Sequence, residues 1–310
     1  ALERYQQAIK CDPQYAEAIE NAASLVFHTH SNTELSRKII DFASFHGATR
    51  PKLQMHMALR AFMERDLKTA KLFLNQYSKV SRDDFYNLSK QDQKFCGSYF
   101  ILLNNLMMHL AEFHSDSNTN SIYHIGESHC LSFAHHKIWL DNNCFSIKPL
   151  LAIGTKAYHF GDVDMNFHKS LAKHYFDSVP KKSKLFLSFG EIDCRCDEGI
   201  IVAAKKNQQP CEDLVETTVL NYLEWFKSLN SKLKHELYFF NVPAPIFNQA
   251  FSKQVNEERL NVIKKFNYFL KNYAKSFKFN LIDAHMLTEG STGYSNNIYH
   301  LDNTHLGPWI

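Results

Sequence analysis

The chain has 310 residues, of which 45% are apolar and 22% are charged, a composition typical of a globular protein long enough for two domains. Its formal net charge of +3, with neutral histidines, is too small to predict nucleic-acid binding, which needs a clustered basic face. The seven cysteines are odd in number and scattered along the chain, so they predict no disulfide framework and favour a reducing, cytoplasmic compartment.

Membrane and secretory segments are not expected. The most apolar stretch, residues 100–113, is interrupted by polar residues and is shorter than the ~20 residues that span a bilayer. No signal-peptide pattern is visible at the start. The sequence begins at Ala1 inside a repeat-like unit, which is consistent with a longer natural chain.

The first 113 residues predict an all-helical domain. Apolar residues recur at helical spacing, and no segment alternates with a period of two. These residues are Leu35, Ile39, Ile40 and Phe42 in one segment and Leu59, Phe62, Leu67, Ala70 and Phe73 in another.

The opening unit resembles a tetratricopeptide (TPR) repeat. The small residues Ala1 and Ala8 leave room for a neighbouring helix, and Pro13 ends the helix because proline cannot donate to the preceding turn. The next helix is expected to begin at Ala16. Later spacings drift from the repeat, so a generic stack of helical hairpins is the alternative. We expect residues 1–113 to form a TPR-like domain that recruits a partner protein or supports an oligomer.

A polar stretch of turn-forming residues at 114–121 predicts a linker to a second domain over residues 122–310. In that second domain, short apolar runs alternate with amphipathic helical segments. The runs are residues 122–125, 150–153, 185–189, 237–240 and 279–282, and the clearest helical stripes extend from Val215 to Leu229 and from Leu260 to Phe277. This alternation predicts an α/β fold whose parallel sheet is covered on both faces, with its ligand site at the carboxyl ends of the strands.

Polar motifs lie where these strands are expected to end. The first three runs end at Gly126, Gly154 and Gly190, and the last run leads to a loop that contains Asp302 and His305. Ser128 follows the first run. A serine hydroxyl becomes a nucleophile when a neutral histidine takes its proton and a carboxylate fixes the histidine tautomer. Ser128, His305 and Asp302 are therefore the predicted catalytic triad, with the Ser128 amide as an oxyanion donor at a helix start.

These motifs resemble the SGNH (GDSL-like) hydrolase family over residues 121–310. Gly126-Glu127-Ser128 stands where that family has Gly-Asp-Ser, and the following His129 resembles the branch whose block reads Gly-Asp-Ser-His. Gly154 matches the glycine of the second block, and Asp302 and His305 match the late Asp-x-x-His.

The resemblance implies a flavodoxin-like three-layer α/β/α fold. It also implies a serine hydrolase that uses no cofactor, with Ser128, Asp302 and His305 as its triad and the amides of Ser128 and Gly154 as its oxyanion hole. The implied substrate is an O-acyl ester, such as an acetyl group on a carbohydrate.

Two positions depart from the family pattern. Glu127 replaces an aspartate that is not a triad member. Ile192 stands where the third block has an asparagine, whose side chain donates to the oxyanion, and removing such a donor costs ~3–4 kcal/mol. Lys156, His159 and Arg195 are the residues expected to compensate.

The expected substrate-binding residues are Gly190, Asp193, Arg195, Lys156 and His159. Two of them have a structural alternative. Asp193 is expected to brace a turn, and Arg195 to pair with Glu191, Asp197 or Glu198. If Arg195 were unpaired in a pocket, it would favour an anionic substrate.

Simpler explanations exist for the other residues as well. Ser128 could be only a helix N-cap, and His305 a histidine of a surface loop. His135 and His136 are expected on a helix after Ser128, without a special role, and Cys130 is expected to be a small buried residue.

The triad leaves three alternative functions open. An acyltransferase would use the same residues, with a sugar hydroxyl in place of water. A non-catalytic binding module would explain the missing asparagine. Cys194 and Cys196 are spaced like metal ligands, which would suit a metal-dependent hydrolase, but no second pair completes such a site and we expect no metal.

Overall fold

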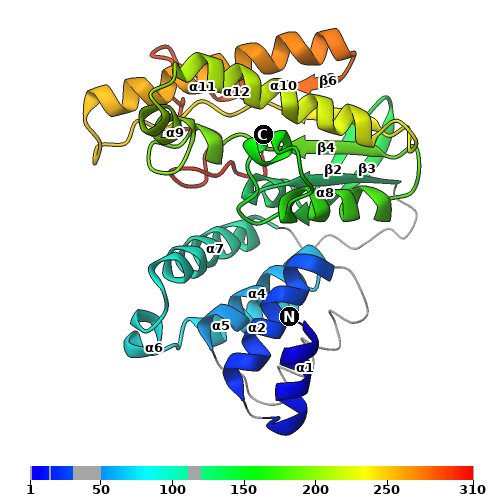
Figure 1. The fold of residues 1–310 in the computed structure, drawn as a ribbon, viewed down its shortest axis with the longest axis vertical. Helices are drawn as coiled ribbons and strands as arrows, with labels where there is room; N and C mark the ends of the chain where they lie inside the picture. The colour runs from blue at the N-terminus through cyan, green and yellow to red at the C-terminus, as the bar shows by residue number, and fades with distance from the viewer. Residues whose placement is uncertain (1, 14, 31–49, 111–119, 310) are drawn as a thin grey trace. The chain divides into compact units, whose positions relative to one another are not determined.

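The computed structural model describes residues 2–13, 15–30, 50–110 and 120–309. It divides into two compact units, Ala1–Phe113 and His114–Ile310 (Figure 1). Within the described ranges, no helix has both the length and the apolar content that crossing a membrane requires.

The N-terminal unit is helical throughout its described residues. Its helices are α1 (Leu2–Cys11), α2 (Ala16–His30), α4 (Pro51–Met63), α5 (Leu67–Tyr77), α6 (Arg82–Tyr86) and α7 (Lys90–His109). The first helix ends before Pro13 and the second begins at Ala16, as the sequence predicts. Ile19 and Ala23 of α2 pack against Leu53 and Met57 of α4 in a small core.

The assignment of this unit to TPR repeats stays a prediction. The helical spacing from Leu35 to Phe42 falls outside the described residues. Of the predicted linker, residues 114–119 are also outside them, whereas Asn120 and Ser121 already belong to the first strand.

The C-terminal unit contains a six-stranded sheet. Its strands are β1 (Asn120–Gly126), β2 (Lys137–Leu140), β3 (Asn143–Leu151), β4 (Lys184–Ser188), β5 (Glu236–Phe240) and β6 (Asn280–Ile282). Their spatial order is β2-β3-β1-β4-β5-β6, and every neighbouring pair is parallel except β2 with β3. Among the five parallel strands the spatial order is β3-β1-β4-β5-β6, so the second strand in sequence is at one edge, beside the first. This is the flavodoxin-like order. The α/β class expected from the sequence is therefore correct.

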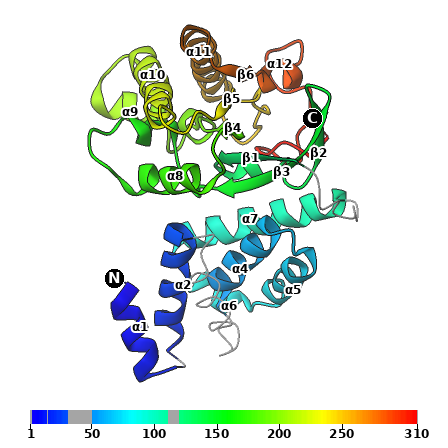
Figure 2. The same cartoon turned by 90° about the vertical axis from the view of Figure 1, so that its right-hand side faces the viewer.

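The main core lies on one face of this sheet, beneath α8 (Phe167–Ser178), α10 (Cys211–Leu229) and α11 (Lys253–Phe277) (Figure 2). The short α9 (Ile200–Asn207) contributes to the same core. Phe176, Phe226 and Phe266 are fully buried there against Leu187 and Phe239 of the strands. Burying one such side chain stabilises the fold by about 1.5–3 kcal/mol.

The opposite face has a different cover. Among the described residues, Phe133, Ala284 of α12 (Ala284–Thr288) and Leu306 pack against Ile122 and Phe186 there. Connections between parallel strands are right-handed. From β1 to β3 the chain moves toward one edge of the sheet, and from β3 to β6 it moves toward the other edge. The β1–β3 connection therefore lies on the face opposite α8, α10 and α11. A second layer of helices was expected on this face. In the part of the chain that the structure describes, the face is covered by one short α-helix, α12, and by segments outside any α-helix.

The β1–β3 connection is where the sequence prediction is wrong. Ser128 begins a 3-10 helix of four residues, η1 (Ser128–Leu131), and His135 and His136 follow it just before β2, outside any helix. The strand expected at 150–153 is β3, which begins at Asn143 and pairs with β2 in a hairpin.

Candidate active site

The turn that carries Ser128, the predicted nucleophile, lies at the point where β1 ends between β3 and β4, and we call it the nucleophile turn. A Cβ on Gly126 would be 2.1 Å from Ser188 Oγ, so only glycine allows β1 and β4 this close approach. The Glu127 amide donates to the Ser188 carbonyl at 3.2 Å, and Ser128 then begins η1. Connections leave this point on opposite faces of the sheet, and such a switch point is where doubly wound folds bind ligands.

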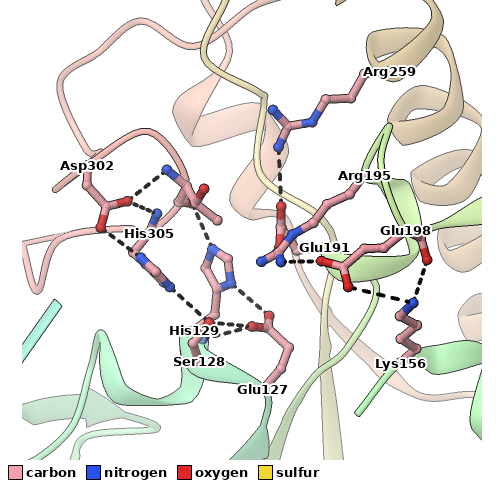
Figure 3. Close-up of polar contacts among 11 residues, drawn as sticks. Glu127, Ser128, His129, Lys156, Glu191, Arg195, Glu198, Arg259, Asp302 and His305 are labelled. Carbon is pink, nitrogen blue, oxygen red and sulfur yellow. Dashed lines mark hydrogen bonds and ion pairs between the residues drawn. The ribbon is translucent and has the colours of Figure 1, made fainter. Parts of the chain in front are cut away.

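The three predicted triad residues lie together in the structure (Figure 3). His305 Nε2 is 2.9 Å from Ser128 Oγ, and His305 Nδ1 is 2.8 Å from Asp302 Oδ2. Glu127, and not Ser128, is the N-cap of η1, and His305 is only 8% exposed, unlike a histidine of a surface loop.

Asp302 is held in its ionised form. Burial alone would raise its pKa, but the hydrogen bonds from His305 and from the amide of Thr304 hold the pKa of Asp302 well below its usual value. Its Oδ1 accepts from the backbone amides of Thr304 and His305 at 2.8 and 2.7 Å. The ionised carboxylate therefore fixes a proton on His305 Nδ1 and leaves Nε2 to face the Ser128 hydroxyl.

A second histidine–carboxylate pair, Glu127 and His129, lies beside Ser128. Glu127 Oε1 is 2.7 Å from His129 Nδ1, and Oε2 accepts from the Ser128 hydroxyl at 2.8 Å and from the His129 amide at 3.2 Å. His129 Nε2 lies 3.0 Å from the carbonyl oxygen of Thr304, between the two triad residues of the late loop. From the sequence, no role was predicted for Glu127, and its pairing with His129 was not predicted either.

The two members of this pair are both charged at neutral pH. Burial alone would raise the pKa of Glu127 and lower that of His129. The attraction and the hydrogen bond between the two groups outweigh this effect of burial. Together they lower the pKa of Glu127 to about 2 and raise the pKa of His129 to about 9.

A network of charges continues from this pair toward α11 and the loop after β3 (Figure 3). Glu191 binds Arg195 at 2.7 Å and Arg259 at 3.2 Å, and Arg195 also binds Glu198 at 2.8 Å. Arg195 thus has two of the partners expected for it. Lys156 Nζ donates to the Glu198 carbonyl.

Glu127, His129 and Glu191 are also the one group in the described part of the chain whose ligand-type atoms could hold a metal ion, all within 4.8 Å of one another. These atoms already have protein partners. His129 Nδ1 is bonded to Glu127, and two guanidinium groups, of Arg195 and Arg259, bind Glu191. A divalent cation would add repulsion from both arginines, so the donor set does not fit a metal.

The predicted oxyanion residues have different surroundings. Ser128 is the first residue of η1, so its amide has no partner within that helix. Gly154 lies three residues beyond Leu151, which is in register with Gly126, and it is exposed with a φ of 66°. Both residues are therefore at the same edge of the sheet. Ile192 is buried in η3 (Ile192–Cys194) and offers no side-chain donor.

The residues expected to compensate for Ile192 are engaged elsewhere. Lys156 and Arg195 belong to the charge network described above. The ring of His159 accepts from the Lys156 amide at 2.9 Å and stacks on His168 at 3.7 Å, and burial lowers the pKa of His159 to about 4.

Asp193 braces a loop, as expected. Its carboxylate accepts from the amides of Ala157 and Tyr158 at 2.7 and 2.9 Å, and burial raises its pKa to about 6. Gly190, with a φ of 131°, packs so closely on Phe266 that a Cβ would be 2.6 Å from its ring. A role of Asp193 and Gly190 in substrate binding stays a prediction.

No family model matches the chain, and no curated protein matches it. Among solved structures, it is similar to phospholipase A1 from Streptomyces albidoflavus at 10% identity and a TM-score of 0.37, with 61% of this chain and 93% of that chain covered.

A GDSL-like lipase from Bacteroides thetaiotaomicron has 14% identity and a TM-score of 0.38, over 66% of this chain and 86% of that one. A lipase/acylhydrolase from Enterococcus faecalis has 12% identity and a TM-score of 0.37, over 61% and 88%. These values are too low to assign the chain to a family.

Proposed function

We propose that the C-terminal unit is a serine ester hydrolase of the SGNH type. The observation that carries this proposal is the unbroken chain of hydrogen bonds from Asp302 through His305 to Ser128. Ser128 and His305 are 177 positions apart in sequence, yet they meet at the switch point of the sheet. A buried serine in contact with a histidine that a carboxylate orients is the arrangement that nucleophilic acyl transfer needs.

In the proposed reaction, Ser128 Oγ attacks the ester carbonyl while its proton moves to His305 Nε2. Asp302 stabilises the imidazolium that forms, and the amides of Ser128 and Gly154 donate to the oxyanion. His305 then gives the proton to the leaving alcohol, and an acyl-serine remains. Water attacks this acyl group while His305 takes a proton from the water. His305 then gives that proton to Ser128 Oγ as the bond from Oγ to the acyl carbon breaks, and the carboxylic acid leaves.

The proposed substrate is an O-acyl ester, with an acetyl ester on a carbohydrate as the first class to test. This choice follows the resemblance of the Gly-Glu-Ser-His and Asp-x-x-His motifs to the SGNH family. The names of the similar solved structures, lipases and an acylhydrolase, also describe ester hydrolysis.

The direct test is hydrolysis of p-nitrophenyl acetate by the wild type and by Ser128→Ala. We expect activity in the wild type and none above background in the variant, because the nucleophile is removed. Circular dichroism would verify that the variant is folded. Equal rates in the two proteins would contradict the proposal.

A further inference from the structure

His129 differs from most histidines in that both of its ring nitrogens face atoms that can only accept a hydrogen bond. Nδ1 faces the ionised carboxylate of Glu127 at 2.7 Å, and Nε2 faces the backbone carbonyl of Thr304 at 3.0 Å. A neutral imidazole carries one N–H, so it could satisfy only one of these bonds. Glu127 Oε2 also accepts from the Ser128 hydroxyl and the His129 amide, which fits an ionised carboxylate. With Glu127 ionised, only a doubly protonated His129 makes both ring hydrogen bonds.

The surroundings of His129 support this state. The nearest carboxylates are Glu127 and, beyond it, Glu191, and both raise the pKa of His129. Two other histidine rings face it. The His305 ring centroid is 5.5 Å away, and the pKa of His300 is lowered by burial and then by the charge of His129. A cation at His129 thus has carboxylates to balance it.

The charge of His129 matters because of where Glu127 lies. Glu127 Oε2 is 2.8 Å from Ser128 Oγ, the atom on which negative charge builds as the hydroxyl loses its proton. A lone carboxylate at that distance would oppose this charge, and burial makes such repulsion stronger than in water. Glu127 is 2% exposed and His129 is 4% exposed. The imidazolium cancels the carboxylate charge, and Glu127 still accepts from the His129 amide when the single hydroxyl proton of Ser128 passes to His305 Nε2.

The same cation joins two distant segments. Its Nδ1 side is bonded to the nucleophile turn through Glu127, and its Nε2 side to Thr304, which lies between Asp302 and His305. The spacing between Ser128 Oγ and His305 Nε2 thus depends on two bonds that, beside an ionised Glu127, only the doubly protonated ring makes together.

We propose that Glu127 and His129 are positioning residues for the Ser128 reaction, acting as a fixed ion pair that holds the Asp302–His305 loop against the nucleophile turn and neutralises the carboxylate beside Ser128. This inference rests on the proposed function, and it adds a second, non-titrating histidine to the site. Glu127 and His129 take no proton from the substrate. They set the distance and the charge balance for the residues that do.

The first test measures protonation directly. In the full-length, ¹⁵N-labelled wild type at pH 7.5, long-range ¹H–¹⁵N correlation of histidine rings should show one ring with protons on both nitrogens, and that ring should vanish in His129→Gln. A singly protonated His129 at this pH would overturn the proposal, whatever the activity of the enzyme.

The second test is a double-mutant cycle on ester hydrolysis. Glu127→Gln should lower kcat by about 10- to 100-fold with little change in KM, because a misplacement of ~1 Å costs about that much. His129→Gln should lower kcat further, since it leaves a carboxylate uncompensated next to Ser128. The double variant should regain part of the loss of His129→Gln. A merely structural pair would lower thermal stability without this recovery in kcat.

His136→Gln is the matched control, because His136 lies in the same connection and burial lowers its pKa, so it is neutral. We expect its kcat to equal that of the wild type. Wild-type inactivity toward esters would overturn the proposed function. Wild-type activity with unchanged kcat in both single variants would overturn this inference alone.

Discussion

Two histidine–carboxylate pairs flank one hydroxyl in this protein, and they differ in what the second ring nitrogen faces. In Asp302–His305 it faces the Ser128 hydroxyl at 2.9 Å, whereas in Glu127–His129 it faces the Thr304 carbonyl at 3.0 Å. A hydroxyl can give up a proton, and a carbonyl has none to give. Similar pairs of side chains can therefore have different roles, a general base in one case and a fixed cation in the other.

The two pairs also differ in their access to solvent. The Glu127 and His129 side chains are 2% and 6% exposed, while the Asp302 and His305 side chains are 24% and 10% exposed. The buried pair is shielded from water, so each charge depends on the other member of the pair. The outer pair lies nearer to the surface, where a leaving alcohol and an incoming water must arrive. Variants of the two pairs should therefore affect activity to different extents.

The largest expected effect separates the two histidines. His305→Gln should lower kcat toward p-nitrophenyl acetate by ~10⁴-fold or more, because the general base is lost. His129→Gln should retain more activity, because the base remains and only its placement and charge environment change. Steady-state kinetics on both variants would check this order, and a greater loss from His129→Gln would reverse the roles assigned to the two pairs.

Asp193 is another buried carboxylate near the site, and in the described part of the chain it binds two backbone amides in place of a histidine. Asp193→Ala should lower the free energy of unfolding by about 2–4 kcal/mol, since the amides of Ala157 and Tyr158 would each lose a buried acceptor. Denaturant titration would measure the change. Asp193→Asn retains one acceptor oxygen and should lose about half as much. No loss in Asp193→Ala would show that water replaces the carboxylate.

The last expected effect is a change of folding stability with pH. The pKa of His129 is raised to about 9 in the folded state, so its contribution to stability is full below pH 6.5 and is lost as the pH rises from 6.5 to 9. The pKa of Glu127 is lowered to about 2, so its contribution is lost as the pH falls from 4.5 to 2. In each of these two pH ranges the free energy of unfolding changes by at most about 1.4 kcal/mol per pH unit.

Thermal unfolding of the wild type and of the Glu127→Gln/His129→Gln variant across pH 2–10 would measure the contribution of the pair in these two pH ranges. The difference between the two proteins should be greatest between pH 4.5 and 6.5. A difference that does not change with pH would mean that the pair is uncharged in the folded protein.

The sheet could be predicted because each buried parallel strand is a short apolar run, as in Leu185–Ser188 and Leu237–Phe240. The edge strand β2 was missed, since only part of Lys137–Leu140 is buried. A signal for it was present. Asp141 and Asn142 have φ of 50° and 61°, and an Asp-Asn pair between two strands favours such a two-residue hairpin turn.

The site was predictable where its residues follow strand ends and lie close together in sequence. Asp302 and His305 are three residues apart and share one loop, and Ser128 follows the first strand. The role of Glu127 was not predictable, because it depends on a ring whose other nitrogen meets Thr304, a carbonyl 175 positions away from His129. Spacing along the chain carries no information about such a contact.

The most direct measurement of the central claim is labelling of the intact protein with a fluorophosphonate, followed by mass spectrometry of its peptides. A fluorophosphonate reacts with a serine only when a neighbouring base activates the hydroxyl. We predict one adduct, on Ser128, in the wild type, and none in Ser128→Ala or His305→Gln. A wild type that stays unlabelled, or an adduct on another residue, would contradict the account.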